Sequence, residues 1–170
     1  MKTIYLAGGC FWGTEHYISQ FEGVVETTVG YANGSVKDPA YEQVYTDQTG
    51  HVECVKVEYD EEMISLATLC RLYFRSIDPL LLNRQGEDIG TRYRTGIYWT
   101  DPEDQTIVEA IFEEVQHGYS EPLAVEKGPL KCFYPGEEYH RKYLVKNPQG
   151  YCHLSLSLLK SAMIYSQILN

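Results

Sequence analysis

The chain has 170 residues, 44% of them apolar and 22% charged, a mix typical of a folded globular protein rather than a disordered one. Its formal net charge of −10 argues against a nucleic-acid partner, because phosphate binding needs clustered Lys and Arg. No stretch approaches the roughly 20 apolar residues of a membrane span, and the first apolar run is too short for a signal peptide. We therefore expect a cytoplasmic protein without a membrane partner. The length predicts one domain over residues 1–170.

The first part of the chain is predicted to alternate strands with one helix. Strands are expected at residues 3–8, 24–31 and 51–59. A helix is expected from Phe11 to about Gln20. The Asn33-Gly34 pair predicts a loop after the second strand.

The helix predicted over about 62–77 has the clearest pattern. Its apolar residues recur at i, i+3, i+4, i+7, i+8 and i+11, namely Leu66, Leu69, Cys70, Tyr73, Phe74 and Ile77. Asp78-Pro79 ends it. Cys70 lies on this apolar stripe, and we therefore expect it to be buried.

The second half of the chain continues the alternation. Strands are predicted at residues 95–100 and 122–126, and helices at about 137–145 and 158–169. Another helix is expected to open with Asp101 as its N-cap and Pro102 in its first turn. Interleaved strands and helices indicate an α/β or α+β fold, with one sheet covered by helices.

The chain has an odd number of cysteines and no C-x-x-C pair; they are Cys10, Cys54, Cys70, Cys132 and Cys152. This pattern favours catalytic or structural thiols in a reducing compartment over a disulfide framework. Cys54 lies in the middle of a predicted strand and is expected to be buried. Cys132 is ambiguous, and a structural role is favoured.

Cys10 is the best candidate for a nucleophile. It follows Gly8-Gly9 and precedes a predicted helix, where unpaired backbone N–H groups and the helix dipole stabilise a thiolate. The alternative from this segment alone is a small buried hydrophobe. Cys152 is the second candidate, because it lies in an irregular, glycine-containing stretch and suits a resolving role in disulfide formation. Its alternative is an incidental surface thiol.

Several further residues are suited to a polar site. Glu53 has the strand parity of Val55, and burial raises the pKa of a carboxyl, so Glu53 is a candidate proton donor. Its alternative is a solvent-facing glutamate. Each of three tyrosines offers a hydroxyl, although packing is their commoner role: Tyr41, Tyr45 and Tyr93. Phe11-Trp12 beside Cys10 is suited to holding a small apolar group, although core packing is again the alternative.

Taken together, six blocks resemble the A-type peptide methionine sulfoxide reductases. In chain order they are Gly9-Cys10-Phe11-Trp12-Gly13 with Glu15, Tyr41-Glu42-Gln43-Val44, Gly50-His51-Val52-Glu53, Asp88-Ile89-Gly90-Thr91-Arg92-Tyr93-Arg94, Tyr134-Pro135-Gly136-Glu137-Glu138-Tyr139-His140 and Lys146-Asn147-Pro148-Gln149-Gly150-Tyr151-Cys152. They cover about residues 3–153, and six ordered blocks are highly specific.

The resemblance implies a ferredoxin-like two-layer sandwich, with a mixed sheet covered by helices and an extended C-terminal coil. It implies that Cys10 attacks the sulfur of a methionine S-sulfoxide, free or in proteins. The sulfoxide oxygen would be held by Glu53, acting as the acid, together with Tyr41 and Tyr93. Phe11 and Trp12 would receive the methyl group, and Asp88 would support the site.

The same resemblance implies how the enzyme is recycled. The sulfenic acid left on Cys10 would form a disulfide with Cys152, and thioredoxin would reduce it, with no metal or other cofactor. The tail after Cys152 has no further cysteine of the kind that some relatives carry, so thioredoxin would attack the Cys10–Cys152 disulfide directly. Cys54 and Cys132 depart from the family pattern and offer alternative thiols.

Two other functions are alternatives to this one. A thiol hydrolase would pair Cys10 with His140 or His51 as base and Asp88 as the orienting group. A zinc-binding interaction module would use Cys10, His140, Cys152 and His153, but the sequence lacks paired ligand spacings.

Overall fold

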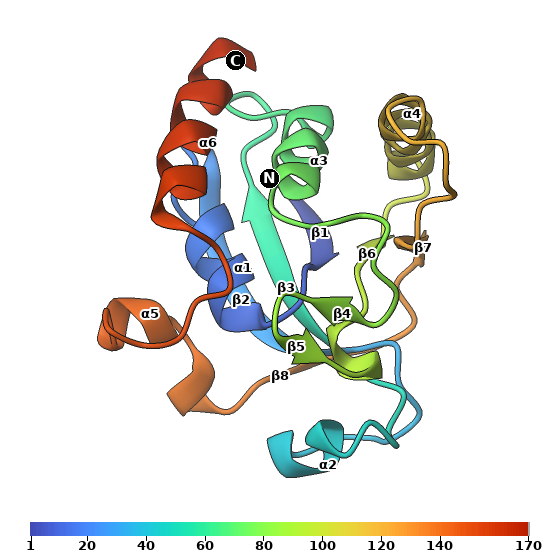
Figure 1. Ribbon diagram of the computed structural model, residues 1–170, viewed down its shortest axis with the longest axis vertical. Helices are drawn as coiled ribbons and strands as arrows, with labels where there is room; N and C mark the ends of the chain where they lie inside the picture. Colours follow the sequence, from blue (N-terminus) through green and yellow to red (C-terminus); the bar gives the residue numbers. More distant parts are fainter. Residues whose placement is uncertain (170) are drawn as a thin grey trace.

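A six-stranded sheet forms the centre of the protein, whose computed structural model describes residues 1–169 (Figure 1). The strands lie in the order β7 (Glu126–Pro129), β6 (Gly96–Trp99), β1 (Lys2–Ala7), β3 (Val52–Tyr59), β2 (Val24–Ala32) and β8 (Phe133–Pro135). The β6–β7 pair is parallel and the other pairs are antiparallel. The prediction of a mixed sheet is therefore confirmed.

Four longer helices and several short elements surround the sheet (Figure 1). The longer helices are α1 (Phe11–Ile18), α3 (Leu66–Arg75), α4 (Asp104–Gln116) and α6 (Leu156–Leu169). The short helices are α2 (Tyr41–Tyr45), η1 (Thr91–Tyr93), η2 (Glu138–His140) and α5 (Tyr143–Lys146), and a small hairpin pairs β4 (Arg84–Gln85) with β5 (Asp88–Ile89). No helix among residues 1–169 is both long enough and apolar enough to cross a membrane.

The alternation of side chains along the strands divides the buried residues between the two faces of the sheet. Ile4 and Leu6 of β1 pack into the main core together with the longer helices. Tyr5 and Ala7 belong to a smaller cluster, which is covered by Leu130, directly after β7, and by Phe133, the first residue of β8. One face is thus covered by helices and the other partly by coil, because successive residues of a strand point to opposite faces.

Helix α3 has the predicted apolar face but starts later than predicted. Ser65 is its N-cap, and the Ser65 hydroxyl accepts a hydrogen bond from the Thr68 N–H at 3.1 Å. Residues 61–64 form a turn. Leu69, Cys70 and Tyr73 are fully buried, so the predicted burial of Cys70 is confirmed.

Helix α4 also begins later than the sequence pattern suggests. The carboxylate of Asp101 accepts from the Glu103 N–H at 3.0 Å and pairs with Lys2 at 2.8 Å, and the helix itself starts at Asp104. The prediction of Asp101 as N-cap is therefore wrong by two residues. Asp101 instead stabilises the turn that precedes the helix.

Two predictions for the C-terminal part are wrong. The strand expected at 122–126 lies instead at Glu126–Pro129, where it pairs in parallel with β6. The helix expected at 137–145 is broken, because Lys142 has a left-handed backbone with φ of 52°. The Lys142 N–H donates to the buried Glu15 carboxylate at 2.8 Å, and this tertiary contact competes with helical geometry there.

Candidate active site

Cys10 lies at the N-cap of α1, at the junction between β1 and the helix. Its side chain is 7% exposed. Gly9 before it has φ of 87°, a conformation that a residue with a side chain rarely adopts. The two glycines therefore allow the chain to leave the sheet and place the thiol against the start of the helix.

Glu53 lies under the same helix start. It comes from β3 and is 2% exposed, and its Oε1 accepts a hydrogen bond from the Phe11 N–H at 3.1 Å. Burial raises the pKa of Glu53 to about 8, although the Phe11 N–H and the Arg92 charge oppose the shift. At neutral pH the Glu53 carboxyl therefore holds a proton that it can donate.

The Cys10 thiol is not ionised by its helix, which corrects the simple expectation from the helix dipole. The backbone N–H groups of Trp12 and Gly13 do lower its pKa. Burial has the larger, opposite effect and raises the pKa of Cys10 well above the ordinary value. The resting site thus contains a protonated thiol beside a protonated carboxyl.

Tyr41 and Tyr93 are near these two groups. Tyr93 ends η1 and is 7% exposed, whereas Tyr41 begins α2 and is half-buried. Burial, with the charges of Glu53 and Cys10, raises the pKa of Tyr41 to about 12 and shifts the pKa of Tyr93 in the same direction. Both hydroxyls therefore stay protonated and available as donors. Tyr45 is 55% exposed and packs on Arg92 instead.

An ion pair that sequence reasoning missed holds the segment carrying Tyr93. The carboxylate of Asp47 lies 2.6 Å from Arg92 Nη1 and accepts from the Arg92 backbone N–H at 3.0 Å. The Arg92 guanidinium lies over the ring of Tyr93 at 4.4 Å and over that of Tyr45 at 4.2 Å. Asp47 has φ of 61°, which nothing in the sequence indicates.

Phe11 and Trp12 both contact the buried His140. The Trp12 indole N–H donates to Nδ1 of His140 at 3.0 Å, and the Phe11 ring lies 5.2 Å from the His140 ring. Trp12 also stacks on Tyr143 at 3.8 Å. These contacts fix the orientation of the indole beside the thiol, and burial lowers the pKa of His140, which keeps its ring neutral.

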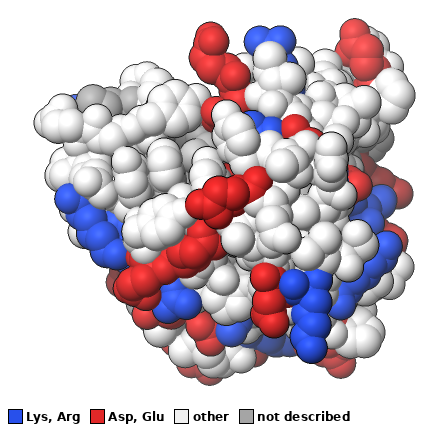
Figure 2. Space-filling model, turned by 90° about the horizontal axis from the view of Figure 1, so that it is seen from below, with Lys and Arg blue, Asp and Glu red and all other residues white. Residues whose placement is uncertain are grey.

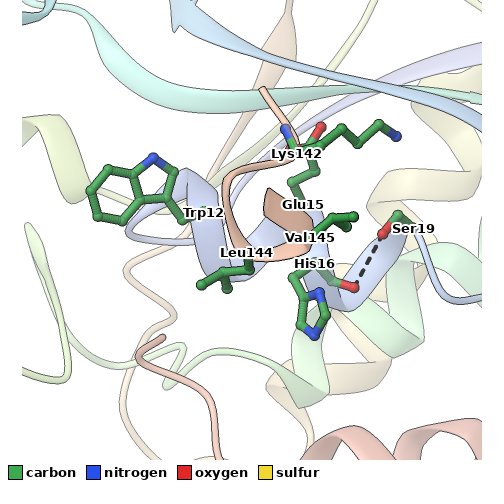
Figure 3. A pocket seen from close by; sticks show the side chains of 7 residues that line it. All are labelled: Trp12, Glu15, His16, Ser19, Lys142, Leu144 and Val145. Atoms are coloured by element: carbon green, nitrogen blue, oxygen red, sulfur yellow. Dashed lines mark hydrogen bonds between the residues drawn. The ribbon is translucent and has the colours of Figure 1, made fainter. Parts of the chain in front are cut away.

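Glu15 is a structural member of the first block rather than part of the reactive cluster. Its carboxylate accepts from the Thr27 hydroxyl at 2.9 Å and from the Lys142 N–H at 2.8 Å. Figure 3 shows Glu15 reaching toward Lys142 beside a cavity of about 10 Å³, which has room for about one water molecule. Neither Cys10 nor Glu53 lines this cavity.

Asp88 connects the site to the segment that carries Cys152. Its Oδ2 accepts from the hydroxyl of Tyr151 at 3.1 Å. Cys152 is half-buried, and a Cβ placed on Gly13 would lie 3.3 Å from its Sγ. Cys152 therefore packs against the first turn of α1, the helix that Cys10 caps. A cavity of about 360 Å³ also borders Cys152.

The other cysteines lie outside this cluster. Cys54 is fully buried, as predicted, on the face of the sheet opposite the main core. Cys132 is half-buried, and its thiol donates to the carbonyl of Gly34 at 3.5 Å.

The bases required by the hydrolase alternative are engaged elsewhere. His51 Nδ1 accepts from the Gly34 N–H at 3.1 Å, and its Nε2 lies 2.6 Å from the Val36 carbonyl. His140 Nδ1 is occupied by Trp12, and its Nε2 lies 3.7 Å from Glu137. For the zinc alternative, no three His, Cys, Asp or Glu side chains are grouped as metal ligands within residues 1–169.

The end of the molecule where α2 lies carries much negative charge. Seen from below, acidic side chains form a band across this face, between uncharged areas and with basic groups toward the edges (Figure 2). A peptide that approaches this end meets a mainly acidic and uncharged surface.

Comparisons with known proteins agree with the geometry. A family model described as peptide methionine sulfoxide reductase matches residues 2–169. Peptide methionine sulfoxide reductase MsrA of Clostridium botulinum is 53% identical over 156 residues, which are 92% of this chain and 99% of that protein. The crystal structure of Mxr1 from Saccharomyces cerevisiae in reduced form has a TM-score of 0.86 at 40% identity and covers 91% of both chains. The structure of Mxr1 in complex with Trx2 has a TM-score of 0.59 at 29% identity, with 84% of both chains covered.

The burial of Glu53 predicts a pH-dependent stability difference. Its folded pKa of about 8 exceeds the ordinary 4.5, so ionisation favours the unfolded chain as pH rises between these values. As the pH rises, the free energy of unfolding of the native protein should therefore fall relative to that of Glu53→Gln. The difference between the two should grow by at most about 1.4 kcal/mol per pH unit. Urea unfolding from pH 4.5 to 8 measures this difference, and Glu62→Gln, at an exposed position, is the control. A constant difference between Glu53→Gln and the native protein would contradict the prediction.

Proposed function

The chain belongs to the peptide methionine sulfoxide reductase family, and we propose that Cys10 is its nucleophile and Glu53 its acid. Its activity is the thiol-dependent reduction of methionine sulfoxide to methionine. The observation that carries the residue assignment is the buried Glu53 carboxyl, which accepts a hydrogen bond from the residue that follows Cys10 and whose pKa burial raises to about 8.

The chemistry of a sulfoxide explains why both groups are needed. Its oxygen leaves sulfur poorly unless it is protonated. As Cys10 Sγ bonds to the substrate sulfur, Glu53 donates its proton to the oxygen. As the bond between the two sulfurs forms, the Cys10 thiol gives its proton to the Glu53 carboxylate. The hydroxyl oxygen then moves to Cys10 Sγ as the substrate S–O bond and the bond between the two sulfurs break, so that methionine leaves and Cys10 holds a sulfenic acid. The sum is Cys–SH plus sulfoxide giving Cys–SOH plus thioether.

The neighbouring side chains are assigned supporting roles. Tyr41 and Tyr93 donate hydrogen bonds to the sulfoxide oxygen, which is supported by the raised pKa values of both hydroxyls. Phe11 and Trp12 receive the methyl group of the S epimer, with the indole held by His140. Asp88 supports the site through its hydrogen bond with Tyr151.

Cys152 resolves the sulfenic acid by forming a disulfide with Cys10. This assignment is supported by the position of Cys152 over Gly13, in the first turn of the helix that Cys10 caps. Thioredoxin then reduces the disulfide, a role supported by the relative Mxr1, which was solved in complex with Trx2. The cycle needs no other cofactor and no metal.

We further propose that residues 1–170 act as one catalytic domain in the cytoplasm. One main core joins the sheet to α1, α3, α4 and α6, which supports a single unit. A reducing compartment is supported by the odd number of cysteines and by the lack of a C-x-x-C pair in the sequence.

The nucleophile and the acid are tested with a methionine-sulfoxide peptide and dithiothreitol. Cys10→Ser should have no activity, because the attacking sulfur is gone. Glu53→Gln should slow the first turnover by about 10²–10⁴-fold, the range for a general acid. Rapid-quench measurement of methionine release gives both results. Full activity of Cys10→Ser would refute the proposed function, and an unaffected Glu53→Gln variant would refute the acid.

The resolving role is tested with two single cysteine variants. Cys152→Ser should release about one methionine per chain without reductant. It should then fail to turn over with thioredoxin, because no intramolecular disulfide forms. Cys132→Ser, a half-buried thiol outside the cluster, is the matched control and should turn over normally. Normal thioredoxin-dependent turnover of Cys152→Ser would show that another thiol resolves the sulfenic acid.

The ion pair beside the site should tune Glu53 in two directions. Arg92 lowers the pKa of Glu53 and Asp47 raises it. If protonated Glu53 is required, the alkaline limb of the first-turnover rate should move to higher pH in Arg92→Gln and to lower pH in Asp47→Asn. The other charged groups that act on Glu53 stay in place. Shifts in the same direction in both variants would indicate general loosening of the loop instead.

A further inference from the structure

His153 follows the proposed resolving cysteine in the chain. It packs against the backbone before Cys10, at Gly8 and Gly9, and after it, at Gly13. Its Nε2 lies 3.0 Å from the carbonyl of Gly8. A Cβ added to Gly13 would meet its Nδ1 at 2.6 Å, and a Cβ added to Gly9 would meet its Nε2 at 3.5 Å. The imidazole thus lies beside the backbone that positions Cys10, and a side chain on Gly13 would displace it.

The contact with Gly8 determines which nitrogen carries the proton. A carbonyl oxygen only accepts, so His153 Nε2 must be the donor. In the neutral ring, Nδ1 then has a free lone pair, and this buried atom has no hydrogen-bond partner. Burial lowers the pKa of His153, which favours the neutral ring. An unpaired buried acceptor is costly, so this one requires an explanation.

The unpaired nitrogen and the Cys152 sulfur lie near the same point, although they do not hydrogen-bond to each other in this resting structure. His153 Nδ1 and Cys152 Sγ are both within 3.3 Å of the point where a Gly13 Cβ would lie. Burial raises the pKa of the Cys152 thiol, so at neutral pH it is mainly protonated. Since the thiolate is the attacking form in disulfide chemistry, Cys152 needs a base.

We propose that His153 Nδ1 is the proton acceptor for Cys152 when Cys152 attacks the Cys10 sulfenic acid. This assignment rests on the proposed function and concerns the second half of its cycle.

The step balances in atoms and electrons. The S–H bond of Cys152 breaks and its proton moves to His153 Nδ1. Cys152 Sγ bonds to Cys10 Sγ, the S–O bond of the sulfenic acid breaks, and the departing hydroxide takes the proton from the imidazolium. The products are the Cys10–Cys152 disulfide and water. The Cys10 sulfur is reduced, the Cys152 sulfur is oxidised, and His153 returns to its neutral form.

The groups facing His153 are compatible with this role. Asp88 on β5 raises the pKa of His153 and so favours the transient imidazolium. The hydroxyl of Tyr151 pairs with Asp88, and Cys10 and Cys152 are the thiols at the same turn of α1. The Gly8 carbonyl keeps the ring oriented throughout, because Nε2 stays protonated in both forms.

The experiment compares His153→Gln with His153→Ala in full-length protein after one turnover without reductant. Gln retains an amide N–H for the Gly8 carbonyl but supplies no base, whereas Ala loses both. Dimedone trapping measures the sulfenic acid, and mass spectrometry of quenched samples measures the Cys10–Cys152 disulfide. His117→Gln, at the exposed end of α4, is the matched control.

Both His153 variants should form the disulfide about 10²-fold more slowly at pH 7, the lower value for general base catalysis. Their sulfenic acid should persist and be trapped. The rate in His153→Gln should rise about tenfold per pH unit, because hydroxide replaces the imidazole, and the native rate should depend less on pH. A His153→Gln variant with the native rate and pH profile would overturn the assignment. If only His153→Ala were slowed, His153 would serve to position the chain through the Gly8 carbonyl, and its role as a base would be refuted. Failure of the proposed function would be separate: the native protein would release no methionine.

Discussion

The hydrogen bond from the Phe11 N–H to the Glu53 carboxyl is the contact on which the rest of the site depends. It joins the middle of the sheet to the first turn of α1, where Cys10 is the N-cap. A carboxyl buried at this point is neutral at pH 7. The free-energy cost of ionising it in a low-dielectric site exceeds the stabilisation of the carboxylate by one backbone N–H and a nearby guanidinium. The fold thereby places a neutral carboxyl, the proposed acid, near the start of the helix that carries the proposed nucleophile Cys10.

The same burial restrains the nucleophile. The helix start favours a thiolate, but burial disfavours it more strongly, and the pKa of Cys10 is raised. A protonated thiol is less prone to indiscriminate oxidation, since susceptibility follows thiolate character and exposure. Reactivity is thus coupled to a substrate that brings an oxygen for Glu53 to protonate. In the proposed mechanism, this coupling directs the attack of Cys10 to oxidised sulfur.

Two partly buried polar contacts hold loops around the proposed site. The Asp47–Arg92 pair holds the turn of Tyr93, and Glu15 holds the left-handed Lys142 near the segment of His140. Both carboxylates bind backbone N–H groups, so they fix the course of the chain as well as pairing charges. Loops positioned by such contacts commonly carry function on a rigid scaffold.

The sequence by itself determined the strand-and-helix alternation, the buried face of α3 and, through its ordered blocks, the family, and it predicted Cys10 as the nucleophile. These features are local or recur in fixed order, so period and motif suffice to identify them. Only the tertiary structure decided that the helix expected at 137–145 breaks at Lys142, that Asp47 pairs with Arg92, and that the Cys10 thiol stays protonated. Each depends on a partner dozens of residues away or on burial among several elements. Such contacts leave no periodic trace in the chain, because the energy of a charge is set by its surroundings rather than by its neighbours in sequence.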